Sequence, residues 1–378
     1  MENRNWTEYK LSDICNIIST KTSIQNATLE NYISTENMIN DFGGVQNAEK
    51  LPTTNTVNSF FKDDILFSNI RTYFKKVWYA KFDGTVSQDV LTFRAKEDIF
   101  SKFLYYILCN PEFTEYTVLT SKGAKMPRGD KDAIKNFELQ LPPFPEQKAI
   151  ASALSSLDDK IDLLHQQNQT LETLAETLFR QWFIEEAKED WEERPLSSIA
   201  NFLNGLACQK FPPKDSINRL PVLKIKDLTS GISENSDWAT TDVKPEYIIR
   251  NGDVIFAWSA SLMVKIWNGE DCILNQHLFK VTSEEFPKWF YYFWCKQHLR
   301  EFISIAQSHA TTMGHIKRSD LDEAMVLIPD NDEIEKMTFQ MTPILDKIQL
   351  NNNQINSLSK LRDTLLPKLM SGEVRVKN

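Results

Sequence analysis

The 378-residue sequence is poor in the residues that most often build cofactor, nucleotide and metal sites. It has only 11 Gly, and it contains no phosphate-binding Gly-rich loop, no Gly-x-Ser-x-Gly nucleophile motif and no His-x-x-x-His pair. The cysteines are scattered without a Cys-x-x-Cys pair, which argues against a disulfide framework or a zinc site. We therefore expect no catalytic residues, no cofactor and no metal ion in this chain.

Long apolar runs are also missing. The longest charge-free apolar run of the second half, Val254 to Val264, is interrupted by serine and is shorter than the ~20 helical residues that cross a bilayer. The first six residues contain no apolar core of the kind found in signal peptides. We expect a cytoplasmic protein with no membrane partner.

An excess of basic residues is the third absence. The chain has 43 Lys and Arg against 52 Asp and Glu, a net charge of −9, which argues against indiscriminate nucleic-acid binding. With 41% hydrophobic residues the composition is that of a globular protein, long enough for about two domains of ~150 residues each.

What the sequence does contain is a repeat of half its own length. The segment Asp64-Ile65-Leu66-Phe67 recurs as Asp253-Val254-Ile255-Phe256, and Lys102 to Tyr106 recurs as Lys288 to Tyr292. Each copy has a mixed region followed by about 40 residues with almost no Gly and a helical pattern. In the mixed regions, a strand is predicted near Asp64 to Ser68 and a helix over Ser101 to Cys109. The predicted parts are residues 1–145, 146–188, 189–330 and 331–378.

The two helical segments carry apolar residues at alternating steps of three and four, as in a coiled coil. The predicted packing positions are Leu154, Leu157, Ile161, Leu164, Leu171 and Leu178 in the first helix, and Ile344, Ile348, Ile355, Leu358 and Leu365 in the second. Each series includes one Asn, Asn168 or Asn351, a residue type that fixes register. Helices of ~40 residues are about 60 Å long, so we expect them to pair, antiparallel, and the alternative is that each packs on its own domain. Pro343 and Pro367 predict a kink or restart and a helix end near Leu366.

Basic and polar residues gather in equivalent parts of the two copies. Residues 121–135 carry a net charge of +3, and a second group follows the strand predicted near residue 68. The candidate DNA-contacting residues are Asn69, Arg71, Lys75, Lys122, Lys125, Arg128, Lys131, Lys224, Lys226, Thr311, Thr312, His315, Lys317 and Arg318. Lys224 and Lys226 are expected to alternate along a strand. Each group alone is typical of a solvated loop, but their repetition favours a protein that binds at two sites.

The whole chain resembles the specificity (S) subunits of type I restriction-modification systems. The resemblance is carried by the run Leu141-Pro142-Pro143-Phe144-Pro145-Glu146-Gln147, by Asp159-Lys160-Ile161, by Pro221 to Leu228, and by the closing segment Leu365 to Glu373. It departs from an even repeat where the second copy has Pro329-Asp330-Asn331-Asp332 in place of the double proline.

This resemblance implies an α+β fold: two mixed target-recognition domains joined by two long antiparallel coiled-coil spacer helices in a duplicated chain. It implies recognition of a split, asymmetric double-stranded DNA target, with two methyltransferase (M) and two restriction (R) subunits as partners. S-adenosylmethionine, ATP and Mg²⁺ would belong to those partners.

Two other interpretations remain open from the residues alone. A coiled-coil scaffold that binds other proteins would explain the helices and the acidic charge, but not the repeated cationic loops. A fused methyltransferase or nuclease is disfavoured, because Asn110-Pro111-Glu112-Phe113 departs from the Asn-Pro-Pro-aromatic motif of adenine methyltransferases.

Overall fold

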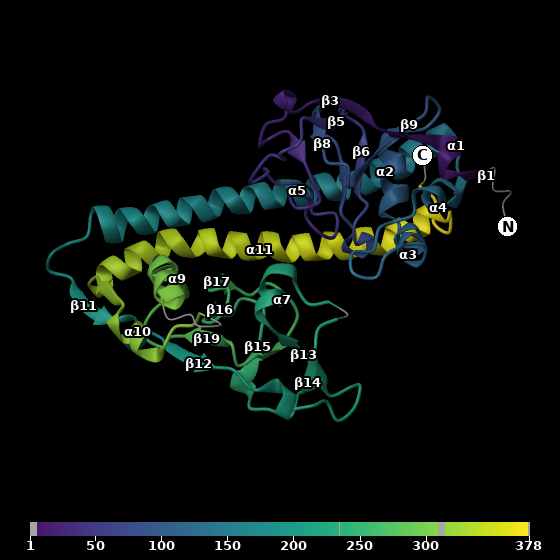
Figure 1. The fold of residues 1–378 in the computed structure, drawn as a ribbon. Helices are drawn as coiled ribbons and strands as arrows, with labels where there is room; N and C mark the ends of the chain where they lie inside the picture. The colour runs from purple at the N-terminus through teal and green to yellow at the C-terminus, as the bar shows by residue number, and fades with distance from the viewer. Residues whose placement is uncertain (1–5, 234, 309–313, 377–378) are drawn as a thin grey trace. The chain divides into compact units, whose positions relative to one another are not determined.

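The computed structural model describes residues 6–233, 235–308 and 314–376. The chain divides into two compact units: Met1–Lys160 with Leu358–Asn378 form unit 1, and Ile161–Ser357 form unit 2 (Figure 1). Two helices, α5 (Phe144–Arg180) and α11 (Asn331–Met370), each contribute residues to both units. Each unit therefore combines one mixed domain with a section of both long helices.

The mixed domain of unit 1 contains short strands and three helices of five or more residues. Its strands are β1 (Thr7–Lys10), β2 (Cys15–Ile18), β3 (Thr20–Ser23), β4 (Tyr32–Ile33), β5 (Thr56–Phe60), β6 (Ile65–Ser68), β7 (Val77–Tyr79), β8 (Gly84–Val86), β9 (Val90–Ala95) and β10 (Glu138–Leu141). Its helices are α1 (Leu11–Ile14), α2 (Ser101–Cys109), α3 (Pro111–Leu119) and α4 (Lys131–Lys135). Both the strand and the helix predicted from the sequence are present.

Two four-stranded sheets, in the orders β2-β9-β6-β7 and β3-β5-β8-β4, form the body of this domain. Strand β6 is buried along its whole length, because its residues alternate between the core under α2 and a second core against the other sheet. At its start the buried carboxylate of Asp64 accepts hydrogen bonds of 2.7 Å from two nitrogens of Arg94 on β9. This pairing satisfies a charge that would otherwise be costly to bury.

The mixed domain of unit 2 repeats this arrangement. Its strands are β11 (Glu192–Pro195), β12 (Asn201–Asn204), β13 (Arg219–Leu223), β14 (Trp238–Thr240), β15 (Ile248–Ile249), β16 (Val254–Ala257), β17 (Met263–Ile266), β18 (Cys272–Leu274), β19 (Leu278–Thr282) and β20 (Met325–Ile328). Its helices are α6 (Leu196–Ile199), α7 (Ile225–Ser230), α8 (Lys288–Gln297), α9 (Leu299–Ser308) and α10 (Arg318–Glu323). The sheet β12-β19-β16-β17 matches β2-β9-β6-β7, with buried β16 in the place of β6. The position of Asp64 is taken by Asp253, which pairs with Lys280 on β19 at 2.7 Å.

The predicted packing positions of both long helices lie inside the protein. Leu154, Ile161, Leu164, Ile348 and Ile355 are buried, and the others are half-buried, namely Leu157, Leu171, Leu178, Ile344, Leu358 and Leu365. The helices pair antiparallel within each unit. In unit 2, Nδ2 of Asn351 donates to Oδ1 of Asn168 over 2.9 Å, and in unit 1, Nη1 of Arg362 lies 3.1 Å from Oδ1 of Asp158.

Each helix also packs on the mixed domain of its unit. In unit 1, Ile150 and Leu154 of α5 share a core with Leu104 of α2 and with Leu369 of α11. In unit 2, residues 175, 179 and 183 of α5 and residues 337 and 341 of α11 share a core with α8. The two alternatives left open by the sequence therefore both occur, since the helices pack on each other and on the neighbouring domain. The four-part division of the chain stays a prediction.

The prediction of a helix break at the prolines was wrong. Helix α11 continues through Pro343 and Pro367 and ends at Met370, four residues beyond the predicted end. Each proline deprives the carbonyl four residues earlier of its hydrogen bond. Those carbonyls belong to Phe339 and Asp363, whose side chains are exposed, so water can replace the missing donor.

Candidate nucleic-acid interface

The structure brings together two basic segments of unit 1 that are 50 residues apart in the sequence. The amide of Arg71 donates to the carbonyl of Pro127 (2.8 Å), and the amide of Gly129 donates to the carbonyl of Asn69 (3.0 Å). Ile70 and Arg128 form an isolated antiparallel bridge between these contacts. We call this pairing of residues 69–71 with residues 127–129 the first junction.

The backbone of the first junction is held in uncommon conformations. Arg71 and Lys75 flank a short turn, Thr72–Phe74, and both have positive φ angles, 49° and 52°, which non-glycine residues adopt at a cost. A Cβ atom at Gly129 would lie 2.7 Å from Oδ1 of the buried Asn69, so only glycine fits there. The surrounding structure thus fixes where the neighbouring side chains emerge.

Cationic side chains surround the first junction on the protein surface. Arg128 pairs with Asp89 at 3.0 Å, Lys75 lies 3.9 Å from Asp41, and Lys122 pairs with Asp130. The hydrogen bond from Lys122 lowers the pKa of Asp130 below its usual value. Exposed ion pairs of this kind contribute little to stability, so a phosphate can replace the carboxylate at small cost.

Three other predicted residues of unit 1 make no ion pair with any residue that the structure describes. The side chains of Lys125 and Lys131 are exposed, and that of Arg71 is half-buried. Lys131 begins helix α4, directly after Asp130, whose carboxylate accepts from the amides of residues 132 and 133. The first junction therefore combines fixed backbone with uncompensated positive charge.

Unit 2 repeats the junction at the equivalent place. The amide of Ala260 donates to the carbonyl of Gly314 (2.9 Å), and the amide of Ile316 donates to the carbonyl of Trp258 (3.1 Å). Ser259 and His315 form the bridge, and Ala260 has a positive φ of 57°, as Arg71 has in unit 1. We call this pairing of residues 258–260 with residues 314–316 the second junction.

Not every predicted residue of unit 2 lies at the second junction. The side chain of His315 is exposed there, and those of Lys317 and Arg318 are exposed immediately after it, at the start of α10. Thr311 and Thr312 lie outside the described residues.

The prediction that Lys224 and Lys226 alternate along a strand was wrong. Strand β13 ends at Leu223, and helix α7 begins two residues later because Asp227 accepts the amide hydrogen of Lys224 (3.0 Å) and closes the first turn. Lys224 pairs with Asp237, away from the residues of the second junction, while Lys226 is exposed on α7.

Several residues of the second junction were missed in the sequence. The ring of Trp258 lies 6.0 Å from that of His277 and 6.2 Å from that of His315, between centroids. Oγ of Ser259 is 3.1 Å from Nδ1 of His277. The repeat offset of 187 to 189 residues could have revealed this site, because it relates these positions to those of the first junction.

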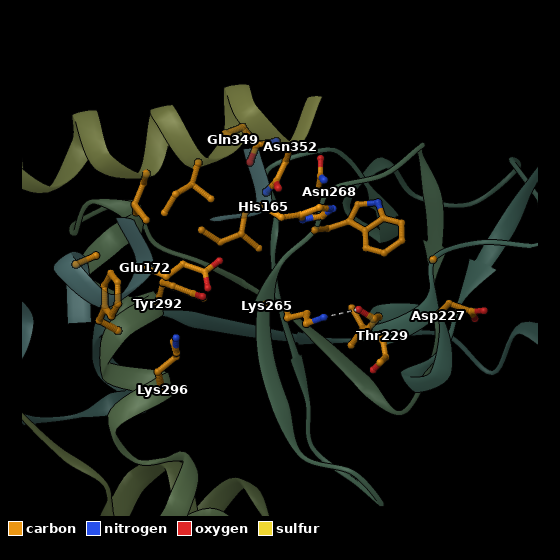
Figure 2. Close-up of a pocket in the computed structure, with 18 residues that line it drawn as sticks. His165, Glu172, Asp227, Thr229, Lys265, Asn268, Tyr292, Lys296, Gln349 and Asn352 are labelled. Carbon is orange, nitrogen blue, oxygen red and sulfur yellow. Dashed lines mark hydrogen bonds between the residues drawn. The ribbon is translucent and has the colours of Figure 1, made fainter. Parts of the chain in front are cut away.

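Unit 2 also contains a cavity of about 380 Å³, lined by α5, α11 and the mixed domain (Figure 2). Its cations are already engaged: Nζ of Lys265 donates to the carbonyl of Leu228 (2.9 Å), and Lys296 pairs with Glu176. Glu172 and Tyr292 face the same space. A cavity with satisfied cations and a free carboxylate is unsuited to a phosphate backbone, so the junctions are the better candidates.

A third surface feature is an apolar stripe on the outer face of each long helix. On α11, Phe339, Leu350 and Leu361 are 83%, 53% and 47% exposed and stand 11 residues apart, which places them on one face. On α5, Leu163 and Leu174 are 45% and 46% exposed at the same spacing. The sequence offset of 187 relates the stripes, so the chain presents two equivalent apolar faces.

Within the described ranges, no group of three or more His, Cys, Asp or Glu residues is placed to hold a metal ion. No helix in the same part of the chain is long and apolar enough to cross a membrane.

Comparison with known proteins was made for the sequence and for the fold. Residues 3–173 and 188–360 each match the family described as the type I restriction modification DNA specificity domain. The specificity subunit of the type I restriction enzyme MjaIX from Methanocaldococcus jannaschii is 28% identical over 355 residues, covering 87% of this chain and 81% of that protein. That of HindI from Haemophilus influenzae is 21% identical, covering 98% and 99%. The crystal structure of the type I restriction-modification S subunit from M. genitalium superposes with a TM-score of 0.60 at 16% identity, covering 98% and 97%, which shows a shared fold.

Proposed function

Because this chain belongs to the type I restriction-modification DNA specificity family, we propose that it is the DNA-recognition subunit of a restriction-modification complex. It reads a target made of two dissimilar half-sites, one with each mixed domain, and it performs no catalysis itself. S-adenosylmethionine, ATP and Mg²⁺ are handled by its partners.

The observation that supports this proposal best is the repeated junction. Two loops with the same backbone hydrogen bonds, each flanked by exposed cations, are what a protein needs to contact two stretches of DNA in the same manner. The side chains at the two junctions differ, so the two half-sites should differ in sequence. A coiled-coil adaptor that binds only proteins leaves both the junctions and the family membership unexplained.

The long helices supply the spacing in this proposal. Helix α5 has 37 residues and α11 has 40, and 37 residues at 1.5 Å each give a length of about 55 Å. Half-sites one helical turn apart are separated by about 34 Å of DNA. Continuous helices paired through a register-fixing Asn can hold a separation of that order constant.

The apolar stripes are the docking faces that we assign to the methyltransferase subunits. Two equivalent stripes, one with Leu163 and one with Leu350, suit two copies of the same partner, and the restriction subunits join that assembly. We expect Leu350→Asp to reduce the number of bound methyltransferase subunits from two to one, and Leu163→Asp with Leu350→Asp to abolish binding, measured as complex mass by analytical ultracentrifugation. Ile217→Asp, at an apolar side chain that is 85% exposed in a loop, is the matched control. Retention of both partners by the double variant would contradict this assignment.

The DNA-recognition role is tested in the complex with the methyltransferase subunits. We expect Lys125→Ala with Arg128→Ala to weaken binding to double-stranded DNA and to reduce the slope of log affinity against log salt concentration by about 0.9 for each lost phosphate contact. Lys50→Ala, at an exposed lysine outside both junctions, is the control. Failure of the unmodified complex to bind or methylate any DNA sequence would refute the proposal. Unchanged affinity and slope in the double variant would remove the first junction from the interface.

A further inference from the structure

The two junctions place different chemistry at equivalent positions. In each unit the segment after the buried strand also bonds to a third segment. The amide of Asn69 donates to the carbonyl of Asp89 (2.8 Å), and the amide of Trp258 approaches the carbonyl of His277 (3.4 Å). Together with the bridges, this repeated pattern makes Arg128 equivalent to His315, and Asp89 equivalent to His277.

At the first junction the equivalent pair is a guanidinium held by a carboxylate. Nη2 of Arg128 lies 3.0 Å from Oδ1 of Asp89, and the two side chains remain 57% and 42% exposed. The backbone of Arg128 is fixed on both sides, because its amide and carbonyl bond to Lys122 (2.9 and 2.8 Å). An exposed guanidinium with fixed backbone and a carboxylate at one edge presents its remaining donors in a defined direction, which suits bidentate contact with a guanine.

At the second junction the pair consists of two imidazoles on either side of an indole. His315 is exposed, and His277 is oriented by Ser259 at one ring nitrogen and by Gln276 at the other, 3.3 Å away. An imidazole offers fewer donors than a guanidinium, and a neutral ring also accepts a hydrogen bond. The second position therefore reads a base edge with other preferences than the first.

We propose that Arg128 and His315 are the equivalent specificity-determining residues of the two recognition domains. Arg128 selects a guanine in one half-site, and His315 contacts a base edge in the other. Asp89 and His277 are positioning residues that orient them. This inference rests on the proposed function, because it assigns base contacts within the DNA-recognition role.

The test uses the complex with methyltransferase subunits, a pool of double-stranded DNA with randomised half-sites, and sequencing of the bound or methylated fraction. We expect Arg128→Ala to relax the preference at one base position of one half-site by about 10- to 100-fold and to leave the other half-site unchanged. His315→Ala should relax one position of the other half-site only.

Two conservative variants separate base reading from charge. Arg128→Lys keeps the positive charge but not the bidentate geometry, so we expect the same relaxed position with an unchanged salt slope. Asp89→Asn should relax that position in part without weakening binding to non-specific DNA, which a loss of folding would not do.

The outcomes distinguish this inference from the function beneath it. Uniform weakening across all sequences with a reduced salt slope would make Arg128 a phosphate contact and overturn the inference alone. An unaltered sequence preference in Arg128→Ala and His315→Ala would do the same. Absence of any sequence preference in the unmodified complex would overturn the proposed function and the inference together.

Discussion

The buried amides between the long helices give the sharpest test of how unit 2 is stabilised. Asn351 is fully buried, and its Nδ2 donates to Oδ1 of Asn168. Asn168 in turn donates to Oδ1 of Asn352 over 2.7 Å. In Asn351→Leu, the Oδ1 atom of Asn168 would lose this donor inside the helix pair.

The expected cost follows from that unpaired oxygen. Leaving a buried acceptor without a donor costs about 1–3 kcal/mol. Oδ1 of Asn351 has no partner among the described residues, so its removal offsets part of that cost, and we expect a net loss of about 1–2 kcal/mol. For a unit of roughly 200 residues, each 1 kcal/mol lowers the melting temperature by about 2–4 °C. Asn168→Leu with Asn351→Leu replaces both partners by apolar groups and should restore or raise the stability.

The assay is differential scanning calorimetry of the full chain, combined with light scattering to follow its oligomeric state. Gln354→Leu, at an exposed amide three residues further along α11, is the control and should leave the melting temperature nearly unchanged. We also expect the double variant to lose uniqueness of pairing, since a buried Asn fixes helix register. If the two single costs simply add in the double variant, the amides are not coupled and this reasoning is wrong.

Two further predictions concern burial. Burial raises the pKa of the Cys15 thiol from 9.0 to about 12, and all five cysteines are buried and free. We therefore expect almost no reaction with a thiol reagent at pH 8 until the protein unfolds, and a loss of stability as the pH rises above about 9, where unfolded thiols ionise and folded ones do not; rapid labelling of the native chain would contradict this. Asp158 accepts from Tyr106 (2.6 Å) and pairs with Arg362, so Asp158→Ala should destabilise unit 1 by about 1–3 kcal/mol in urea unfolding, whereas Asp159→Ala, at an exposed position, should not. Equal effects of the two changes would show that the buried network contributes nothing.

The features predicted correctly from the sequence are those fixed by local pattern. The repeat of Asp64 to Phe67 at Asp253 to Phe256 marks the same buried strand in both units, and Ser101 to Cys109 forms the predicted helix. The alternating apolar steps predicted the pairing of the long helices, because a period of 3.5 places one face of each helix against a neighbour.

The errors arose where one local signal outweighed another. Pro343 breaks a helix by intrinsic preference, but packing on both sides and an exposed carbonyl allow α11 to continue. The alternation of Lys224 and Lys226 resembles a strand, whereas Asp227 one residue later caps a helical turn. Strand and helix compete closely over such short stretches.

The junctions could not be predicted, because their defining contacts join distant segments. Nothing near Arg128 in the sequence indicates that it pairs with Asp89, or that its backbone lies beside Ile70. Composition identified the cations, and only the fold showed which of them share a site.

The discontinuity of unit 1 has a consequence for synthesis on the ribosome. Leu366, Leu369 and Met370 are buried in the same core as residues made more than 200 positions earlier. The first domain to leave the ribosome therefore waits, with an apolar surface uncovered, until nearly the last codons have been translated. Damage at the 3′ end of the coding sequence would consequently be felt first at the opposite end of the polypeptide.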